Sequence, residues 1–218
     1  MKNLSGKTYK GVINGWPGQM TGPEVIISMI KHAAQTDGGF DPNTGYNYPQ
    51  LISKFTMGAV SYNQAVNNYL AGKLEADSKP NSKPYKDGKH YTGKEHSWDE
   101  AFGYFGAPAH AMKLNAKQAY GIAKKSDIKV ADANDDGVVD LYTEMTFAHA
   151  YYAADSDKTG TKYMHTIVGA YIEGRKKITS ADGSALIDQQ RAQLMGYAKT
   201  IKTNWEMVIA EAAFKYAG

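Results

Sequence analysis

The sequence contains no cysteine among its 218 residues. Disulfides, thiolate metal ligands and a cysteine nucleophile are therefore excluded. No apolar run approaches the ~18 residues that a membrane-spanning helix requires. The formal charge is only +3, and the lysines are scattered among acids without forming a block. This weak and dispersed charge argues against nucleic acid as a partner.

Signatures of catalysis are also missing. The chain has no H-E-x-x-H, no G-x-S-x-G, and neither the phosphate-loop nor the dinucleotide-binding glycine motif. The adjacent carboxylates of Asp99 and Glu100 point about 100° apart on a helix, which suits joint action on one bond poorly. The sequence gives no positive indication of an enzyme, so we expect a non-enzymatic protein.

The chain does have enough apolar residues for a substantial core. Hydrophobic residues make up 42% of it and charged residues 22%, and there are 16 tyrosines. This composition is typical of a globular protein with many half-buried aromatic side chains. Apolar residues recur every three and four positions, whereas convincing alternation with period two is missing. We expect an all-α bundle of about seven helices with long loops.

Apolar spacing and caps mark the expected helices. The clearest spans residues 48–72, where Leu51, Phe55, Val66 and Leu70 belong to one stripe. The other expected helices begin near Thr21, Glu95, Asn115, Asp140, Tyr163, Ser184 and Thr203. Two prolines and many polar residues indicate a surface loop or linker over residues 75–93.

The N-terminal region differs in composition from the rest. Five glycines lie within residues 1–22. We therefore expect an irregular Gly-rich arm over 1–22 and a helical domain over 23–218. The first residues lack an apolar signal core, so either the protein stays inside the cell or a leader has been removed.

The most specific local pattern is the segment "DANDDGVVD". Its oxygen-bearing side chains occupy positions one, three, five and nine of a calcium loop, and these are Asp132, Asn134, Asp136 and Asp140. Gly137 stands at position six, where such a loop turns sharply. Alternating oxygen ligands wrap a hard cation. The segment therefore predicts a DxNxDG calcium-type loop.

The end of this segment departs from the EF-hand pattern. Position twelve is Thr143 where an EF-hand has a bidentate glutamate, and the acid stands one residue later. If Asp140 begins a helix, Glu144 faces back toward it, so we expect Glu144 and the carbonyl of Val138 to complete the shell. A single such loop indicates a structural Ca²⁺ ion. The alternative is a solvated turn in which Asp140 caps the next helix.

A second candidate site lies in the segment "EHSWDEAFGYFG". On a helix, His96 has both Asp99 and Glu100 as neighbours one turn away. Imidazole and carboxylate at this spacing bind transition metals such as iron or zinc in helical bundles. Further ligands would come from His149, His165, Glu144 or Glu173. The alternative is a buried polar network, in which His96 satisfies a core hydrogen bond and Asp99 or Glu100 caps backbone or meets an arginine such as Arg175. The aromatic side chains of the segment would then serve in packing.

Three segments resemble a bacterial envelope family of uncharacterised function, whose members are usually larger lipoproteins. They are "YNQAV" at 62–66, "YTGKEHSWDEAFGY" at 91–104 and "EGRKKITSADGSALIDQQRAQL" at 173–194. The resemblance runs from about residue 46 to the end. It implies an exported protein, periplasmic or at the cell surface, whose leader is absent from this sequence.

That family is similar to imelysin, an all-helical envelope group that is linked to iron uptake and carries a G-x-H-x-x-E motif. The nearest equivalents here are Gly93, His96 and Asp99. The glycine lies one position too far from the histidine, and aspartate replaces glutamate. The resemblance implies an imelysin-like bundle.

Three functions are open at this point, in our order of preference. The first is an exported, non-enzymatic binding protein with a structural calcium loop and a transition-metal site at His96, Asp99 and Glu100. The second is a structural or partner-binding module of the cell envelope whose Tyr-rich faces meet another protein. The third is an imelysin-type metallopeptidase in which His96 is a metal ligand and Glu100 the general base.

Overall fold

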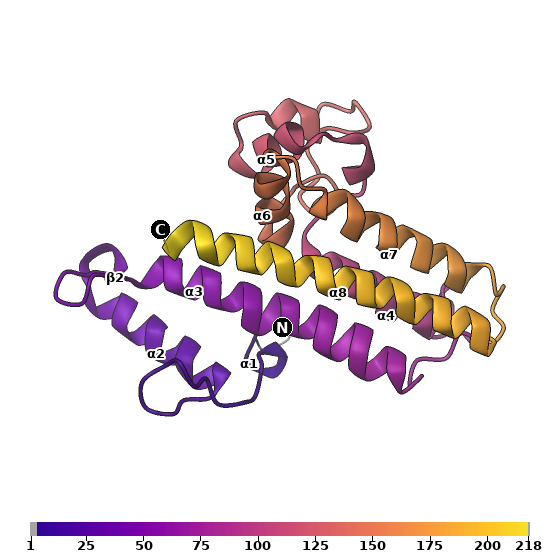
Figure 1. The fold of residues 1–218 in the computed structure, drawn as a ribbon, viewed down its shortest axis with the longest axis horizontal. Coiled ribbons are helices and arrows are strands. Elements are labelled where there is room, and N and C mark those ends of the chain that lie inside the picture. Colours follow the sequence, from indigo (N-terminus) through magenta and orange to yellow (C-terminus); the bar gives the residue numbers. More distant parts are fainter. Residues whose placement is uncertain (1–3, 218) are drawn as a thin grey trace. The chain divides into compact units, whose positions relative to one another are not determined.

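The structure, a computed structural model, describes residues 4–217, and its regular secondary structure is almost entirely helical (Figure 1). The α-helices are α1 Leu4–Lys7, α2 Gly22–Gln35, α3 Tyr48–Thr56, α4 Gly93–Phe105, α5 Ala116–Lys124, α6 Ala148–Asp157, α7 Tyr163–Thr179 and α8 Asp188–Ala217. The remaining helical segments are the 3-10 turns η1 Asp37–Gly39, η3 Ala111–Lys113 and η4 Ile128–Ala131 and the π-helix η2 Met57–Lys73. A two-stranded antiparallel hairpin joins β1 Phe40–Asp41 to β2 Tyr46–Asn47. The prediction of an all-α fold with about seven helices is confirmed.

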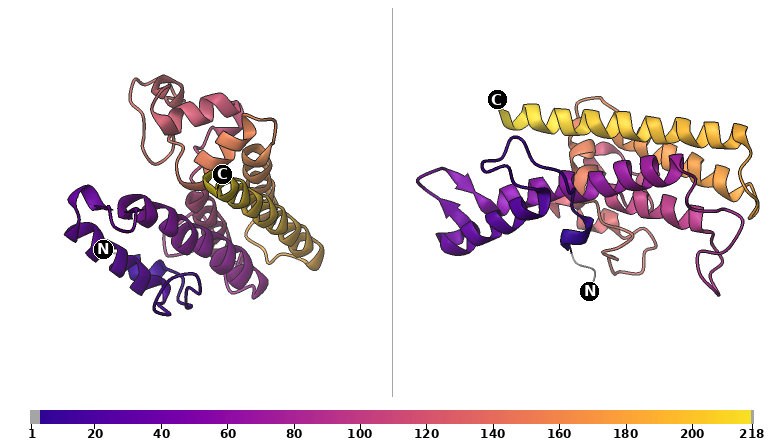
Figure 2. Two further views of the ribbon diagram at one scale, coloured as in Figure 1. Left: turned by 60° about the vertical axis from the view of Figure 1, so that its left-hand side comes forward. Right: turned by 90° about the horizontal axis from the view of Figure 1, so that it is seen from below.

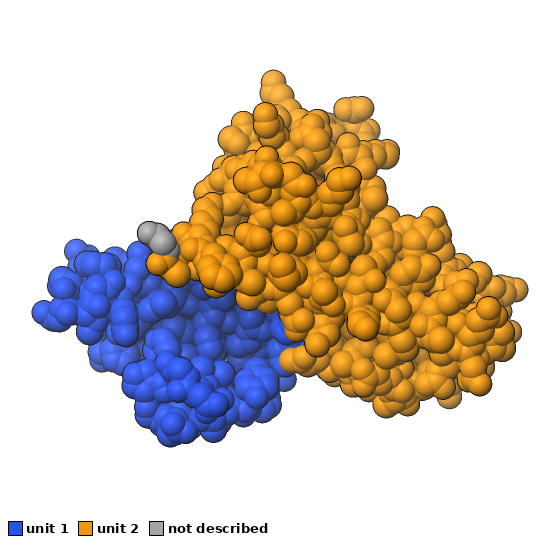
Figure 3. Space-filling model, viewed as in Figure 1, with its two compact units in different colours: residues 1–64 blue, residues 65–218 orange. Residues whose placement is uncertain are grey.

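The chain divides into two compact units, Met1–Gln64 and Ala65–Gly218 (Figure 3). This division falls within η2. The separation of an arm over 1–22 from a helical domain over 23–218 stays a prediction of the sequence. None of the described helices is both long and apolar enough to cross a membrane.

The first unit is built around a small apolar core. Val25, Ile26 and Met29 of α2 are buried together with Tyr48, the first residue of α3. The glycine-containing N-terminal segment is hydrogen-bonded to the start of α2, since Gly22 donates its N–H to the carbonyl of Gly11. A Cβ at Gly22 would lie 2.2 Å from the carbonyl oxygen of Tyr9, so only glycine allows this approach.

The long helix predicted over residues 48–72 is present, but its winding changes at Met57. Up to Thr56 it is an α-helix, and from Met57 to Lys73 it is a π-helix. The buried pairs of this region, Ala59 and Val60, Ala65 and Val66, and Tyr69 and Leu70, follow one another at intervals of six and then four residues. The α-helical winding that a spacing of three and four predicts is therefore present only up to Thr56.

In the second unit, α7 and α8 run antiparallel and pack along their lengths (Figure 1, Figure 2). The sequence predicted two helices where α8 is continuous. Its buried residues Leu194, Ala198, Ile201, Trp205 and Val208 alternate spacings of four and three without interruption. Because this stripe runs through Thr200 to Thr203, the core side of the helix has no break there.

The helix predicted to begin at Asp140 instead begins at Ala148. The preceding residues run beside the end of α4, where Phe147 donates its N–H to the Gly106 carbonyl and Ala109 donates to the Thr143 carbonyl. A Cβ at Gly106 would lie 2.4 Å from the carbonyl oxygen of Phe147. Tertiary backbone pairing thus overrides the helical pattern of the sequence.

Helices α4 and α7 approach each other closely where Trp98 meets Gly174. The indole N–H of Trp98 donates to the carbonyl of Tyr171 at 2.8 Å, and the Tyr171 hydroxyl donates to the carbonyl of Ala101 at 3.1 Å. A Cβ at Gly174 would lie 2.1 Å from the indole. Glycine at this position is therefore required for the two helices to pack.

Substitution of Gly174 tests this packing. We expect Gly174→Ala to lower the free energy of unfolding by about 1–3 kcal/mol, because the added methyl overlaps the buried indole. The matched control is Gly169→Ala on the same helix, whose Cβ would lie 4.0 Å from the nearest atom, the Met112 Cε. The control should be neutral or stabilising by roughly 0.5–1 kcal/mol. Urea unfolding of both variants provides the measurement, and equal stabilities would contradict the proposed role of Gly174.

Candidate functional site

The first candidate site begins at the N-terminus of α4, which is closed by a capping box. Thr92 accepts the Glu95 N–H at 3.1 Å, and Glu95 accepts the Thr92 N–H at 2.8 Å. The Thr92 hydroxyl also donates to the Asn81 side chain at 2.7 Å. Asn81 in turn donates to the carbonyls of Ile178 and Ser184 at 3.1 and 2.9 Å. The cap therefore ties the loop before α4 to the end of α7.

Arg175 of α7 connects the carboxylates of α4. Its Nη1 lies 2.6 Å from Glu95 Oε1, and its Nε lies 2.9 Å from Asp99 Oδ1. The hydroxyl of Thr179 also donates to Glu95 Oε1 at 3.0 Å. The expected contact between Asp99 and Arg175 is confirmed, whereas the pairing of Glu95 with Arg175 was not expected from the sequence.

The environment of Glu95 favours its ionised form. Burial of the carboxyl acts to raise its pKa, but the Thr92 N–H, the Thr179 hydroxyl and the Arg175 guanidinium together hold the pKa below its usual range. Only 8% of Glu95 is exposed. A carboxylate that is both capping and paired in this way holds two helices in register.

His96 lies against two tyrosines of the preceding loop, which also stack on each other. Its ring centroid is 3.7 Å from that of Tyr85 and 5.6 Å from that of Tyr91. Its Nε2 is 3.6 Å from Glu100 Oε2, so the expected neighbour one turn away is present. Glu100 also interacts with the hydroxyl of Tyr69, and burial followed by this contact raises the pKa of that phenol.

The structure does not bring the predicted transition-metal ligands together. Asp99 forms its ion pair with Arg175, whereas His96 and Glu100 pair with each other. Within residues 4–217, no group of three or more His, Asp or Glu side chains is arranged to hold a metal ion. His149 lies instead against Trp205, where burial lowers its pKa to about 4. His165, Glu144 and Glu173 do not complete such a group either.

The second candidate site is the loop that begins at Asp132. Asp132 accepts the backbone N–H groups of Asp136 and Gly137 at 3.2 and 2.9 Å. Asp136 accepts the N–H of Val138 at 2.8 Å and the amide of Asn134 at 2.9 Å. Gly137 has a φ of +82°, so the sharp turn predicted at position six is present. The side-chain oxygens thus fold into the loop and shape its backbone.

Glu144 closes this loop from within the protein. Its Oε1 accepts the N–H of Ala133 at 2.9 Å, and its Oε2 accepts the N–H of Asp140 at 2.8 Å. Only 5% of Glu144 is exposed. One carboxylate therefore bridges the two arms of the loop, although it does so through backbone donors.

Asp140 behaves as the alternative interpretation expected, but it caps a turn and not a helix. It accepts the N–H groups of Tyr142 and Thr143 at 2.7 and 2.9 Å, and these bonds lower its pKa. The apolar side chains around it face solvent, with exposed fractions of 68% for Val138, 70% for Leu141 and 94% for Tyr142.

Several residues that build the site were not singled out from the sequence. Asn81 is 2% exposed although it lies in the segment predicted as a surface loop. Its position between Pro80 and Ser82, in a stretch with a second proline at Pro84, was the available signal for a constrained turn. Tyr85 belongs to the same segment, and no periodicity there indicated its contact with His96.

The pairing of Glu95 with Arg175 is tested by the pH dependence of stability. Glu95→Gln keeps a hydrogen-bonding side chain but removes the charge, and should cost about 1–3 kcal/mol at neutral pH. Because the folded-state pKa of Glu95 is lowered, this contribution is present above about pH 4.3 and is lost as the pH falls further. Chemical unfolding from pH 7 to pH 3 should show the two proteins converging at the acid end. The control Glu173→Gln, an exposed partner of Lys176, should follow the wild type throughout. A gap between Glu95→Gln and the wild type that persists at pH 3 would contradict the proposed ionic role.

Comparison with known proteins gives one match. The model of the family described as domain of unknown function DUF4856 matches residues 29–216. No curated protein and no solved structure matches the chain. The matched range contains α4, α7 and the Asp132 loop, together with all three segments named in the sequence analysis. Because the match extends over most of its length, the chain belongs to the DUF4856 family.

Proposed function

We propose that this protein is an exported, non-enzymatic binding protein in which the Asp132 loop holds a structural Ca²⁺ ion. The observation that carries the proposal is the uncompensated negative charge of that loop. Residues 132–144 contain five carboxylates and no lysine or arginine. In the part of the chain that the structure describes, none of these carboxylates forms an ion pair.

The donors of the loop suit a hard divalent cation. Asp132, Asn134 and Asp136 supply side-chain oxygens at alternate positions, and the carbonyl of Val138 and the carboxylate of Asp140 follow in the same segment. Glu144 already joins both arms of the loop. These residues fit calcium in type and order, while the described side chains do not yet form a converged cluster. Bound calcium would neutralise the carboxylates and fix the segment between η4 and α6.

Export is supported by the resemblance of three segments to an envelope family. The same segments acquire a physical role in the fold. Trp98 and Glu95 of the second segment meet Gly174 and Arg175 of the third. A periplasmic or cell-surface location is part of the proposal.

A second function, a partner-binding module of the cell envelope, is favoured by the apolar tip of the same loop. Val138, Leu141 and Tyr142 are each more than two-thirds exposed within five residues. Exposed apolar groups gathered in one place commonly mark a surface for another protein. Calcium and partner binding are compatible, since the ion would hold the segment that presents these side chains.

Iron or zinc at His96, Asp99 and Glu100 has less support. The guanidinium of Arg175 lies 2.9 Å from Asp99 and competes with any cation for that carboxylate. An imelysin-type metallopeptidase would need His96 as a ligand and Glu100 as the base. Glu100 interacts with both His96 and Tyr69. His96 and Glu100 together offer a metal fewer than three ligands.

Neutral variants of the loop test the calcium proposal. Asp132→Asn and Asp136→Asn each remove one charge but keep a carbonyl acceptor. At calcium 100-fold above the Kd, binding adds about 2.7 kcal/mol. Loss of binding should therefore lower Tm in calcium by roughly 5–10 °C. In chelator, the Tm of each variant should stay close to that of the wild type.

The matched control is Asp135→Asn, which removes the same charge at a position that is not a ligand in the pattern. Asp135 has a φ of +58°, which asparagine also adopts readily. The control should retain the calcium-dependent rise in Tm, and titration calorimetry should show one site. If all three variants lose equal Tm in calcium and in chelator, the ion has no part in this loop.

Elemental analysis of the purified protein separates the remaining functions. We expect no stoichiometric iron or zinc, because Asp99 is occupied by Arg175. Iron or zinc that is lost on His96→Ala would establish the transition-metal site. Peptide hydrolysis that disappears in Glu100→Gln, with the metal retained, would establish the metallopeptidase.

A further inference from the structure

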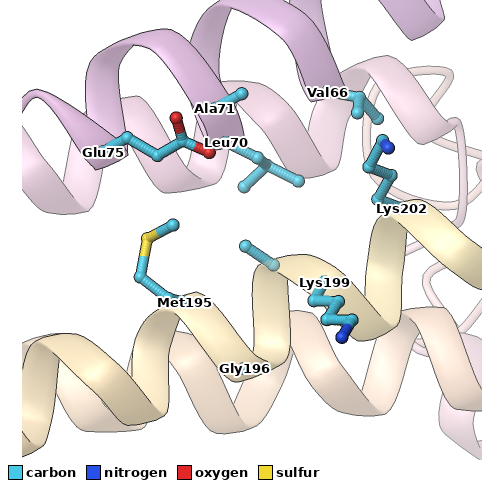
Figure 4. A pocket seen from close by; sticks show the side chains of 9 residues that line it. Val66, Leu70, Ala71, Glu75, Met195, Gly196, Lys199 and Lys202 are labelled. Atoms are coloured by element: carbon cyan, nitrogen blue, oxygen red, sulfur yellow. The ribbon is translucent and has the colours of Figure 1, made fainter.

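Two further features of the molecule lie outside the candidate sites. One is an apolar groove of about 410 Å³ between η2 and α8, whose lining includes Leu70 and Met195 (Figure 4). The other is a turn at Asn14 and Gly15 in the first unit. The groove offers a surface, whereas the turn carries an amide carbon and an amide nitrogen that can react with each other.

Asn14 is the only asparagine in the sequence that is followed by glycine. Asparagine is thermolabile, because the backbone nitrogen of the next residue can attack its side-chain carbonyl carbon. A Cβ on that next residue crowds the attacking nitrogen, and glycine has no Cβ. The pair of Asn14 and Gly15 therefore meets the covalent requirements of this reaction better than any other asparagine in the chain.

The fold places this pair in an exposed β-turn. Trp16 donates its N–H to the carbonyl of Ile13 at 3.0 Å, so Asn14 and Gly15 are the two central residues of the turn. Such a turn does not use the N–H of its third residue, and among the described residues the Gly15 N–H has no acceptor. Both Asn14 and Gly15 are exposed. The attacking nitrogen is therefore not held by a hydrogen bond.

The side chain of Asn14 is not held either. Within the part of the chain that the structure describes, it has no hydrogen-bond partner. By contrast, the side chains of Asn81, Asn115 and Asn204 are hydrogen-bonded to the backbone. A bonded carboxamide must break that contact before it can turn toward the next nitrogen. Both reacting groups of the Asn14 turn can therefore meet without loss of a hydrogen bond.

We propose that Asn14 and Gly15 form a site of spontaneous covalent modification. The backbone nitrogen of Gly15 bonds to Cγ of Asn14, the bond from Cγ to the side-chain nitrogen breaks, and the Gly15 proton leaves with that nitrogen as ammonia. Water then opens the cyclic succinimide at either of its carbonyl carbons. One opening gives aspartate. The other gives isoaspartate, in which the backbone runs through the side-chain carbons.

Isoaspartate at this position loosens the N-terminal segment. The turn is flanked by Ile13 and Trp16, and both side chains pack against the core formed by α2 and Tyr48. Ile13 also donates its N–H to the carbonyl of Met20 at 2.8 Å. Isoaspartate adds one carbon to the backbone between Ile13 and Trp16, so the turn and the two core contacts no longer fit the same spacing. The modification therefore destabilises the first unit.

The test incubates the full chain at physiological temperature and mildly alkaline pH and maps its peptides by mass spectrometry. We expect Asn14 to become a mixture of aspartate and isoaspartate, at a rate within about ten-fold of that of the free peptide VINGWPG. The other asparagines should convert at least about ten-fold more slowly than Asn14, because a side chain crowds the next nitrogen. If Asn14 stays intact while the peptide reacts, or converts no faster than the other asparagines, the proposal is wrong.

The variant Gly15→Ala separates the reaction from the fold. A Cβ at Gly15 would meet no atom within 4 Å, and the φ of Gly15 lies outside the left-handed region, so alanine fits the turn. We expect conversion of Asn14 to slow by about ten-fold or more, because the methyl group crowds the attacking nitrogen. The matched control is Gly103→Ala at an exposed position of α4, where a Cβ also meets no atom within 4 Å. The control should convert Asn14 at the wild-type rate, and a wild-type rate in Gly15→Ala would overturn the assignment.

The effect on the first unit is measured on the modified protein. Both products carry a new carboxylate, so ion-exchange chromatography separates them from the unmodified chain, and freshly purified Asn14→Asp provides the reference for aspartate. The isoaspartate fraction should unfold about 2–8 °C below that reference, because only isoaspartate lengthens the backbone. If the two unfold at the same temperature, the coupling of this turn to the core of the first unit is wrong.

Discussion

The contact between the Trp98 indole and the backbone of Gly174 determines much of the larger unit. Because no side chain separates the two helices there, Arg175 on the next position of α7 reaches both Glu95 and Asp99. Glu95 also caps α4, so one carboxylate serves the start of a helix and the interface between two helices. A change in the distance between α4 and α7 would therefore disturb the packing, the ion pairs and the cap together.

Parts of this arrangement could be predicted from the sequence. Apolar spacing gave the helical class, and the spacing of Glu95, His96, Asp99 and Glu100 correctly placed neighbours one turn apart. The partner of Asp99 could be suggested but not decided, because helical spacing carries no information about a residue 76 positions away. The prediction that this helix begins at Asp140 was wrong for a related reason. Residues 143–147 precede α6 and pair with the backbone that follows α4. Local periodicity describes a helix that packs through its own side chains, and it fails where a distant backbone supplies the hydrogen bonds.

The Asp132 loop shows a different limit. Its Asx bonds and the positive φ at Gly137 agree with the predicted pattern. The sequence also predicted that Glu144 turns back into the loop, and the structure places its two oxygens on the N–H groups of Ala133 and Asp140. Glu144 reaches the loop in a different way from the one expected, since Asp140 begins a turn and not a helix. A pattern of ligands therefore described the shape of the loop better than it described the role of each oxygen.

The burial of Asn81 has a consequence for how the polar segment after η2 behaves. Although its composition is typical of a flexible linker, the segment is held in place by Asn81, which donates hydrogen bonds to the carbonyls of Ile178 and Ser184. A short insertion at the tip around Gly88 lengthens only an exposed bend, where chain closure costs little. An insertion beside Asn81 would detach that anchor from the turn after α7. Sites for a fluorescent label or an affinity tag are therefore best chosen near Gly88.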